Sequence, residues 1–400
     1  MIRWLEVRLM NVPLLDLQAQ YSTIKDKVRA AVDHVLESQR FILGAQVSAL
    51  EEEIGKFCGV PFAVGVASGT DALLISLKAL GVGPGDAVVT VPFTFFSTAG
   101  TIVNLGARPV FVDIEETGFE MDPERLSAFF SRECTFNLTT RKTVHKASGT
   151  VIKAIVPVHL YGQCADMDEI LAIAQRHNVP VVEDACQAIG AAYKGRNAGA
   201  MGDLGCFSFF PSKNLGGAGD GGMIITSNPK LAEHVRLLRA HGAHQRYFHS
   251  IVGFNSRLDE LQAAILRVKL PYLQEWSNAR HENAVRYGMD FQAAGLLSQV
   301  KPPEVLPDRS HIFHQYVIRC EMRDDLQAFL KAQGIGSEIY YPVPLHEQEC
   351  FRSLGYAATD LPRSHAASKE TLALPVYPEL SDAQRGHVVA SMAAFYRGQR

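Results

Sequence analysis

Lys213 is the residue whose type and surroundings point most clearly to covalent chemistry. It ends the run Cys206-Phe-Ser-Phe-Phe-Pro-Ser-Lys213, and glycines follow it. A lysine in a partly dry pocket can lose its proton, and the neutral amine forms Schiff bases with carbonyl compounds. Upstream, Asp184 offers a carboxylate, which is the usual partner of the pyridinium nitrogen of pyridoxal phosphate (PLP). The pair predicts a PLP-dependent enzyme, with Lys213 and Asp184 as its catalytic residues.

A phosphate site is predicted at Ser68-Gly69-Thr70-Asp71, which lies between a predicted strand and a predicted helix. The free N–H groups and the dipole of a helix N-terminus attract anions. A plain helix cap by Ser68 or Thr70 would give the same pattern. The sequence has no G-x-x-x-x-G-K-[ST] motif here, so a nucleoside triphosphate loop is not indicated.

Other polar and aromatic residues could complete this site. Asp184 falls at the end of a buried strand, the edge where open α/β sheets bind ligands, although a helix cap or buried ion pair is the alternative. Gln187 could contact a phenolic oxygen or cap a turn. The Ser208 hydroxyl, at the end of another predicted strand, suits a phosphate oxygen. Phe95 could stack on a planar cofactor or pack in the core.

Basic residues gather in one later segment. Residues 234–258 contain no acidic residue but hold several arginines and histidines. Arginine binds phosphate oxygens bidentately, so His241, Arg246 and Arg257 are candidates for contact with a phosphate-bearing substrate. A solvated basic loop is the alternative.

Three further histidines have a less specific pattern. His311 and His346 are additional candidates for substrate contact, although each of them could be structural. The spacing of His311, His314 and His346 matches no metal site, and no metal is predicted.

Short β-branched runs alternate with helical patterns along the first two thirds of the chain. This alternation predicts an α/β fold with a mostly parallel sheet flanked by helices. The predicted strands are 62–67, 87–91, 109–112, 152–158, 179–182 and 205–209. The predicted helices here are 21–36, 47–57 and 71–80.

The rest of the chain has a different pattern. Residues 131–150 are polar and aperiodic, which predicts a surface loop or excursion. A long amphipathic helix is expected from Arg257 to about Trp276, and a helix over 324–333. We therefore predict a large α/β domain over residues 10–256 and a smaller C-terminal α+β domain over 257–400.

Composition excludes several classes of protein. The chain has 400 residues, is 47% hydrophobic, and carries a net charge of -3, which gives no field for nucleic acid or an anionic membrane. Seven cysteines without a C-x-x-C pair indicate neither a zinc site nor a disulfide framework. Residues 1–9 do not read as a signal peptide, and Met10 is a plausible alternative start. No uninterrupted apolar stretch predicts a membrane span, so a cytoplasmic protein is expected.

Seven motifs in order resemble the DegT/DnrJ/StrS type of nucleotide-sugar aminotransferase, which has the fold type I PLP architecture. They are Ser68-Gly-Thr-Asp-Ala-Leu, Pro92-Phe-Thr-Phe-Phe-Ser-Thr, Val158-His-Leu-Tyr-Gly-Gln, Glu183-Asp-Ala-Cys-Gln-Ala, Ser208-Phe-Phe-Pro-Ser-Lys-Asn-Leu-Gly, Gly253-Phe-Asn-Ser-Arg-Leu-Asp-Glu-Leu-Gln-Ala-Ala and Tyr340-Tyr-Pro-Val-Pro-Leu-His. The resemblance covers nearly the whole chain.

The resemblance implies a role for each matched residue. It implies that Lys213 is the Schiff-base lysine, that Asp184 pairs with the ring nitrogen, and that Gln187 contacts the ring hydroxyl. The phosphate would be held by the Thr70 and Asp71 amides and the Ser208 hydroxyl, with Phe95 stacked on the ring. Asn255 matches a residue that reaches the phosphate from a neighbouring subunit, which implies a homodimer with shared active sites. Arg257 lies beside it and would meet the substrate.

The resemblance also implies the substrates. L-glutamate is the usual amino donor of this family, and the acceptor is a keto-sugar nucleotide. The stretch after Lys213 is similar to members that aminate the third sugar carbon. A sugar dehydratase of the same fold is one alternative, but those relatives replace the lysine with histidine. A non-catalytic regulator is the other alternative.

Overall fold

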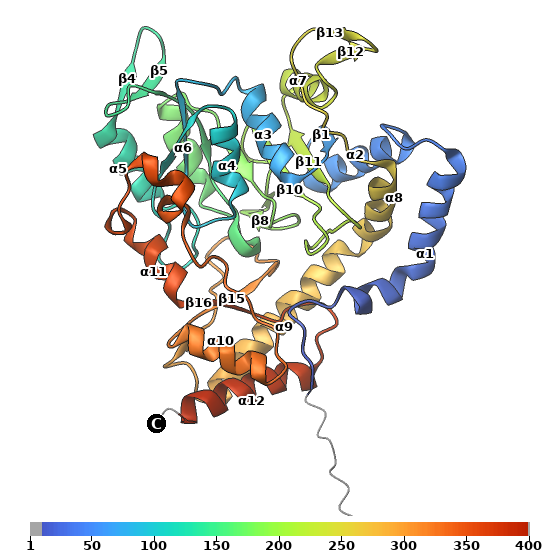
Figure 1. Ribbon diagram of the computed structural model, residues 1–400, viewed down its shortest axis with the longest axis vertical. Helices are drawn as coiled ribbons and strands as arrows, with labels where there is room; N and C mark the ends of the chain where they lie inside the picture. Colours follow the sequence, from blue (N-terminus) through green and yellow to red (C-terminus); the bar gives the residue numbers. More distant parts are fainter. Residues whose placement is uncertain (1–9, 399–400) are drawn as a thin grey trace, which may run out of the picture.

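The computed structural model of the protein describes residues 10–398 (Figure 1). The first nine residues, for which we expect no signal peptide, lie outside the described residues. No helix within residues 10–398 has the length and apolar character needed to cross a membrane.

A central sheet is built from two groups of strands that meet where β6 and β7 run side by side. Its order is β3 (Arg108–Phe111), β2 (Asp86–Thr90), β6 (Val151–Val156), β7 (Val182–Asp184), β10 (Leu204–Ser208), β11 (Gly222–Thr226) and β1 (Phe62–Val66). Within this row β11 runs antiparallel to both of its neighbours, and the other adjacent pairs are parallel. The predicted α/β fold with a mostly parallel sheet is confirmed.

Helices cover both faces of this sheet, because alternate residues of each strand point to opposite faces. Val64, Val88 and Ile224 pack with α3 (Gly69–Ala79) and α7 (Pro229–Arg239) on one face. Ala63 and Val89, their chain neighbours, belong to the core on the other face. That core includes residues of α2 (Ala45–Cys58), α5 (Pro123–Glu133) and α6 (Met167–Arg176).

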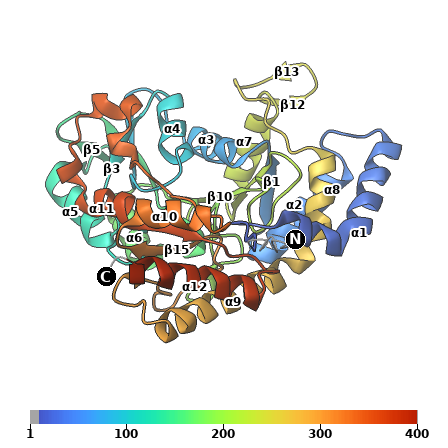
Figure 2. The same ribbon diagram turned by 60° about the horizontal axis from the view of Figure 1, so that its bottom comes forward.

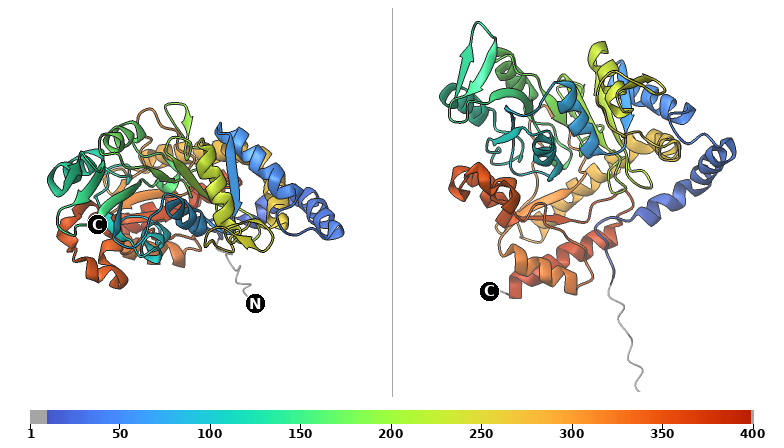
Figure 3. Two further views of the ribbon diagram at one scale, coloured as in Figure 1. Left: turned by 90° about the horizontal axis from the view of Figure 1, so that it is seen from above. Right: turned by 45° about the horizontal axis from the view of Figure 1, so that its top comes forward.

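Of the surface loop or excursion predicted over residues 131–150, the irregular loop is wrong, because the segment is an ordered excursion. This segment forms a β-hairpin of β4 (Cys134–Asn137) and β5 (Lys142–His145), which extends the sheet beside β6 and projects from the molecule (Figures 1 and 3). The Asn137 side chain accepts hydrogen bonds from the N–H groups of Thr139 and Thr140 and so shapes the turn. The buried residues of β5 are Thr143 and His145. Because these inward-facing residues are polar, the sequence shows no alternation of apolar and polar residues that would predict a strand.

The single helix predicted from Arg257 to Trp276 is also wrong. The chain forms α8 (Glu260–Lys269), a 3-10 turn at Leu270–Tyr272, and α9 (Leu273–Ala293). Pro271 lies in that turn, and a proline removes a helix donor and crowds the preceding turn. This break was readable from the sequence.

The C-terminal part forms a smaller layer below the central sheet. β14 (Val300–Lys301), β15 (Tyr316–Cys320) and β16 (Thr371–Leu374) make an antiparallel sheet, packed with α10 (Arg323–Ala332) and α12 (Asp382–Gly398). Figure 2 shows α10 and α12 in front of β15.

The boundary between the two predicted domains stays a prediction. Val12 pairs with Ile335 and so joins the start of the described chain to the C-terminal layer. Conversely, α8 packs against α1 (Leu17–Ser38) and α2.

Glu260 of α8 holds the N-terminus of α2. Its carboxylate accepts hydrogen bonds from the N–H groups of Gly44 (2.7 Å), Gln46 (2.9 Å) and Val47 (2.9 Å). Gly44 is the N-cap of α2 and has no side chain that could do this. A buried carboxylate from another helix therefore supplies the cap of α2. Its negative charge also interacts favourably with the positive end of the helix dipole.

We predict that Glu260→Gln lowers the free energy of unfolding by about 2 kcal/mol, because hydrogen bonds to a charged acceptor are replaced by neutral ones. The matched control is Glu52→Gln, which removes the same charge from an exposed position of the same α2 and should change stability by less than about 0.5 kcal/mol. Urea unfolding measures both. Equal effects of the two substitutions would contradict the capping role.

Candidate active site

A cavity of about 450 Å³ opens at the carboxyl ends of the parallel strands. Eight of the predicted site residues line it: Ser68, Gly69, Thr70, Phe95, Asp184, Gln187, Ser208 and Lys213. They come from the segments that follow β1, β2, β7 and β10, and parallel strands place such segments at one edge of the sheet. We call this space the main cavity.

One wall of the main cavity is the N-terminus of α3. The Thr70 and Ser97 hydroxyls are 2.8 Å apart, and both residues line the wall with Ser208. Gly69 lets this helix approach β10, because a Cβ atom on Gly69 would lie 2.6 Å from the Ser208 Cβ. Hydroxyls beside a helix N-terminus form a cradle suited to a phosphate.

The Asp184 carboxylate lies across the main cavity and is 6% exposed. Its Oδ2 accepts a hydrogen bond from the Thr98 hydroxyl (2.8 Å), and its Oδ1 accepts one from the Cys186 N–H (3.2 Å). Both bonds fix the orientation of the carboxylate. A carboxylate held in this way can pair with a protonated ring nitrogen.

Glu183, the preceding residue, points to the other side of the strand and is fully buried. It accepts hydrogen bonds from His159 Nε2 (2.8 Å) and from the N–H groups of Gly199 (2.8 Å), Met201 (2.6 Å) and Gly202. His159 Nδ1 accepts a bond from a backbone N–H, so the ring proton lies on Nε2 and is donated to Glu183. These bonds anchor the strand end that carries Asp184.

Lys213 lies in the connection between β10 and β11. Its backbone N–H donates to the Phe210 carbonyl (2.8 Å), and the Gly217 N–H donates to the Phe209 carbonyl (2.8 Å). Burial lowers the pKa of the Lys213 amine below its usual value of 10.5, against the opposite effects of Cys186 and Asp184. A lowered pKa increases the neutral fraction of the amine, which is the form that attacks carbonyls and accepts protons.

Phe95 and Gln187 lie on the remaining walls of the main cavity. The Phe95 side chain is 55% exposed, and its ring centre lies 6.3 Å from that of Tyr341. The Gln187 side chain accepts a bond from the Tyr161 N–H (2.8 Å) and donates one to the Tyr341 hydroxyl (3.1 Å). Gln187 therefore holds Tyr341 at the edge of the main cavity.

Seven predicted site residues do not line the main cavity: Asp71, Asn255, Arg257, His241, Arg246, His311 and His346. The Asp71 N–H already donates to the Ser68 hydroxyl (3.0 Å), and its carboxylate accepts a bond from the Ser256 hydroxyl (2.7 Å). The hydrogen bond between Ser256 and Asp71 therefore holds the chain around Asn255 against the N-terminus of α3.

The predicted histidines are placed differently from one another. His311 is buried and stacks on Phe313 with ring centres 3.9 Å apart, and burial lowers its pKa to about 3. His346 is 2% exposed. His241 and Arg246 are both exposed and belong to the segment around the hairpin of β12 (Ala243–Gln245) and β13 (Phe248–His249). Contact of these residues with a substrate stays a prediction.

Sequence reasoning missed several residues that line the main cavity or hold its walls. They are Thr94, Ser97, Thr98, Cys186, Ser212, His314, Gln315, Tyr340 and Tyr341. The threonines and Ser97 lie in the motif that contains Phe95, so that motif was a usable signal. Nothing in the sequence shows that His314 and Gln315 come close to Lys213, because they reach it only through the packing of the C-terminal part.

These residues fit PLP in three respects. A hydroxyl-lined helix N-terminus suits its phosphate, a buried ionised carboxylate suits its ring nitrogen, and a desolvated lysine suits its aldehyde. The three groups line one cavity of a size typical for small-molecule sites.

Comparison with known proteins gives the same assignment. Residues 22–393 match the DegT/DnrJ/EryC1/StrS aminotransferase family. The chain is 49% identical to a "pleiotropic regulatory protein" of Geobacillus stearothermophilus, over 97% of this chain and 99% of that protein. It is 43% identical to a UDP-N-acetyl-3-dehydro-alpha-D-glucosamine 3-aminotransferase of Acidithiobacillus ferrooxidans, over 93% of this chain and 95% of that protein.

Solved structures agree with the fold. The crystal structure of S. venezuelae DesV in complex with a ketimine intermediate superposes with a TM-score of 0.88 at 37% identity, over 96% of this chain and 98% of that one. The structure of ntda from Bacillus subtilis, which has PMP bound, gives 0.86 at 28% identity, over 99% and 87%. The predicted fold type I architecture is confirmed, and the chain belongs to the DegT/DnrJ/EryC1/StrS aminotransferase family.

Proposed function

We propose that this protein uses PLP to move an amino group from L-glutamate to a nucleotide sugar with a keto group at the third carbon. The observation that carries the proposal is that Lys213, Asp184 and the N-terminus of α3 all line the main cavity. The name of the Acidithiobacillus relative supports a 3-keto acceptor.

PLP supplies an aldehyde that takes up the amino group and a ring that stabilises negative charge at the reacting carbon. Asp184 would pair with the ring nitrogen and favour its protonated form, and Thr98 and the Cys186 N–H hold that carboxylate in place. Ser68, Thr70, Ser97 and Ser208 would hold the phosphate.

Lys213 Nζ moves the proton in both directions. Burial lowers its pKa, so the amine can accept the proton that leaves the α-carbon of the donor and hold it for return to the cofactor. The same atom reverses these transfers when the keto sugar takes up the amino group. One residue can serve both half-reactions because both substrates react at the same place in the main cavity.

A regulatory role is the second candidate, since the Geobacillus relative is named for regulation. A regulator could bind the cofactor and a sugar nucleotide without turning them over. An enzyme would lose the visible absorbance of its bound PLP when L-glutamate is added, whereas a regulator would keep it.

We propose in addition that the active unit is a homodimer. The segment around β12 (Ala243–Gln245) and β13 (Phe248–His249) projects from the top of the molecule in Figure 1. Tyr247, Phe248 and Val252 in it are 77%, 67% and 90% exposed. Apolar groups exposed together mark an interaction surface, and a second copy of the chain would cover them and bring Asn255 near its cofactor phosphate.

The first prediction from this function concerns the acceptor. The aminated form of the enzyme should return to the PLP form when a 3-keto sugar nucleotide is added, and about 10-fold or more slowly with a 4-keto isomer, because a misplaced carbonyl cannot reach the amino group of the cofactor. Stopped-flow absorbance measures both rates. Faster reaction of the 4-keto isomer would overturn the position of amination.

The matched controls for this experiment are Lys213→Arg, which keeps the positive charge but cannot form a Schiff base, and Lys230→Arg at an exposed site. Only the first should abolish turnover. In the wild type, borohydride reduction should fix the cofactor to the peptide that contains Lys213, as read by mass spectrometry.

The second prediction concerns Thr98. Thr98→Val removes the hydroxyl that donates to Asp184 Oδ2, so the ionised carboxylate is less stable and affinity for PLP should fall about 10-fold, as expected for one hydrogen bond to a charged group. Thr101→Val is the control. Thr98 and Thr101 are both buried in α4 (Ser97–Asn104), but the Thr101 hydroxyl donates only to a carbonyl of that helix. Absorbance titration with PLP compares them. An equal loss of PLP affinity in both variants would show that the hydrogen bond from Thr98 to Asp184 has no specific role in binding.

The third prediction concerns shared active sites. Lys213→Ala and Asn255→Ala should each impair turnover, and co-expression should restore roughly a quarter of wild-type activity, because half of the dimers are mixed and each has one intact site. Sedimentation equilibrium gives the mass in solution. A monomeric mass would contradict the proposal. So would an activity of the co-expressed variants that is no higher than the activity of each variant alone.

A further inference from the structure

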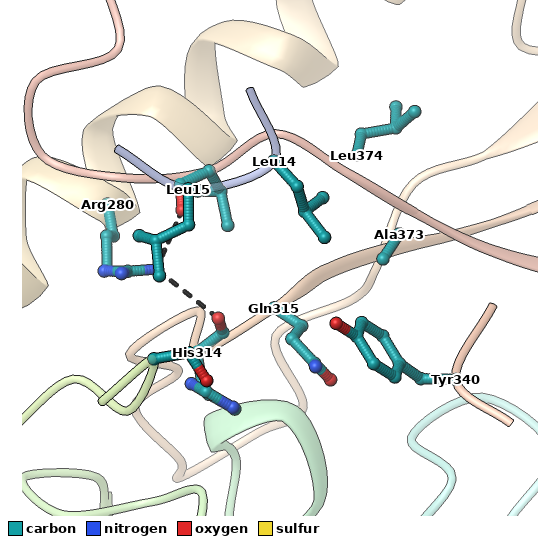
Figure 4. A pocket seen from close by; sticks show the side chains of 10 residues that line it. Leu14, Leu15, Arg280, His314, Gln315, Tyr340, Ala373 and Leu374 are labelled. Atoms are coloured by element: carbon teal, nitrogen blue, oxygen red, sulfur yellow. Dashed lines mark hydrogen bonds between the residues drawn. The ribbon is translucent and has the colours of Figure 1, made fainter. Parts of the chain in front are cut away.

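A second, smaller cavity of about 80 Å³ adjoins the main cavity. The two spaces share Ser212, His314, Gln315 and Tyr340 as lining residues, and Ser212 immediately precedes Lys213. In Figure 4, Arg280 lies at one end of this space, with Leu14 and Leu15 along one side. We call it the side chamber.

Arg280 of α9 is the unusual residue of the side chamber. It is 3% exposed, and its Nη1 donates to the carbonyl groups of Phe313 (3.1 Å), His314 (3.4 Å) and Val376 (2.8 Å). None of the ion pairs found within residues 10–398 includes it. Buried guanidinium groups are normally paired with an acid, so neutral carbonyls leave positive charge at this end of the chamber.

Desolvation lowers the pKa of Arg280 to about 10, and Glu379 opposes this only from a distance. Arg280 therefore stays charged at neutral pH. A carboxylate in the side chamber would supply the missing partner, and arginine binds carboxylates with paired N–H donors.

His314 adds no charge to the chamber. Asn214 Nδ2 donates to the Ile312 carbonyl (3.2 Å), so Asn214 Oδ1 is the atom that faces His314 Nδ1 at 3.0 Å and accepts its proton. Burial, Lys213 and Arg280 hold the pKa of His314 well below 6.5, and the ring is neutral. Arg280 is thus the cation of the side chamber.

Gln315 supplies an independent indication of a ligand. Its Oε1 is buried and has no hydrogen-bond partner among the described residues. An unsatisfied buried acceptor is costly, and a ligand N–H would satisfy it. A ligand that carries both an amino group and a carboxylate would meet Gln315 and Arg280 together.

We propose that the side chamber binds the side-chain carboxylate of the amino-acid donor, so that Arg280 selects glutamate. This inference rests on the proposed function. The methylene groups of glutamate would contact Leu14 and Leu374, while its amino group lies toward Lys213. A space of 80 Å³ accepts a short carboxylate arm but no sugar ring or nucleotide, which the larger main cavity accommodates.

The decisive experiment uses the wild-type holoenzyme and compares L-glutamate with L-glutamine, its neutral isostere, in a single donor half-reaction followed by absorbance. Glutamate should be preferred about 100-fold, and Arg280→Met should remove most of that preference by slowing glutamate alone. The reaction of the aminated enzyme with a keto-sugar nucleotide should be unchanged in this variant. Equal use of glutamate and glutamine by the wild type would overturn the inference and leave the aminotransferase function standing.

Arg280 also tethers backbone, so the test needs a control for stability and a second variant. Arg323→Met is the control, because Arg323 is also buried (7% exposed), its Nη1 donates to the Thr371 carbonyl (3.0 Å), and it lines neither cavity. Its donor preference should stay at the wild-type value. Ala373→Leu fills the side chamber from a residue that is not a hydrogen-bond partner of Arg280, and it should slow the glutamate half-reaction about 10-fold or more.

A binding measurement does not depend on turnover. Calorimetry should show that glutarate, a non-reactive dicarboxylate, binds the wild-type holoenzyme at least about 10-fold more tightly than butyrate does, and that Arg280→Met abolishes this difference. Equal binding of glutarate and butyrate to the wild type would overturn the inference even if no donor reacts. Failure of every donor, with glutarate binding intact, would overturn the proposed function instead.

Discussion

Two consecutive buried carboxylates at the end of β7 set the geometry on which the rest of the site depends. Side chains alternate along a strand, so Glu183 and Asp184 point to opposite sides. Glu183 takes hydrogen bonds from His159 and from backbone N–H groups of residues 199–202, whereas Asp184 has fewer partners and faces the main cavity. The first acid fixes the strand end, and the second can therefore keep one orientation toward a ligand.

The sequence allowed this part of the site to be predicted because chain connectivity and sheet topology agree. Ser68, Asp184 and Ser208 each follow a run of residues that forms a buried strand, and parallel strands end at the same edge. Lys213 comes only a few residues after the end of β10, so its approach to Asp184 required no knowledge of distant packing. The motif resemblance then favoured cofactor contacts over the alternative roles of Phe95 and Gln187.

Residues whose position depends on long-range packing could not be predicted. His314 and Gln315 reach the cavity that Lys213 lines, and Arg280 reaches the side chamber, only after the C-terminal sheet docks below the central one, and no local pattern encodes that docking. The β4–β5 hairpin was missed because its inward side chains are polar. The break between α8 and α9 is different, because Pro271 is a local signal for it. The apolar periodicity continues across this proline and therefore hides the break.

The proposed arrangement assigns the two substrates to different anion-binding groups while they share one proton carrier. Lys213 must serve both, because each half-reaction moves a proton at the same carbon of the cofactor. Arg280 is deep and reaches only a small chamber, whereas the basic segment over residues 234–258 is exposed throughout its stretch 244–250. A short dicarboxylate can use the first and a nucleotide diphosphate is too large for it. In this proposed arrangement, selectivity for the donor would be separated in space from selectivity for the sugar, and substitutions in residues 234–258 would change the acceptor without disturbing the donor.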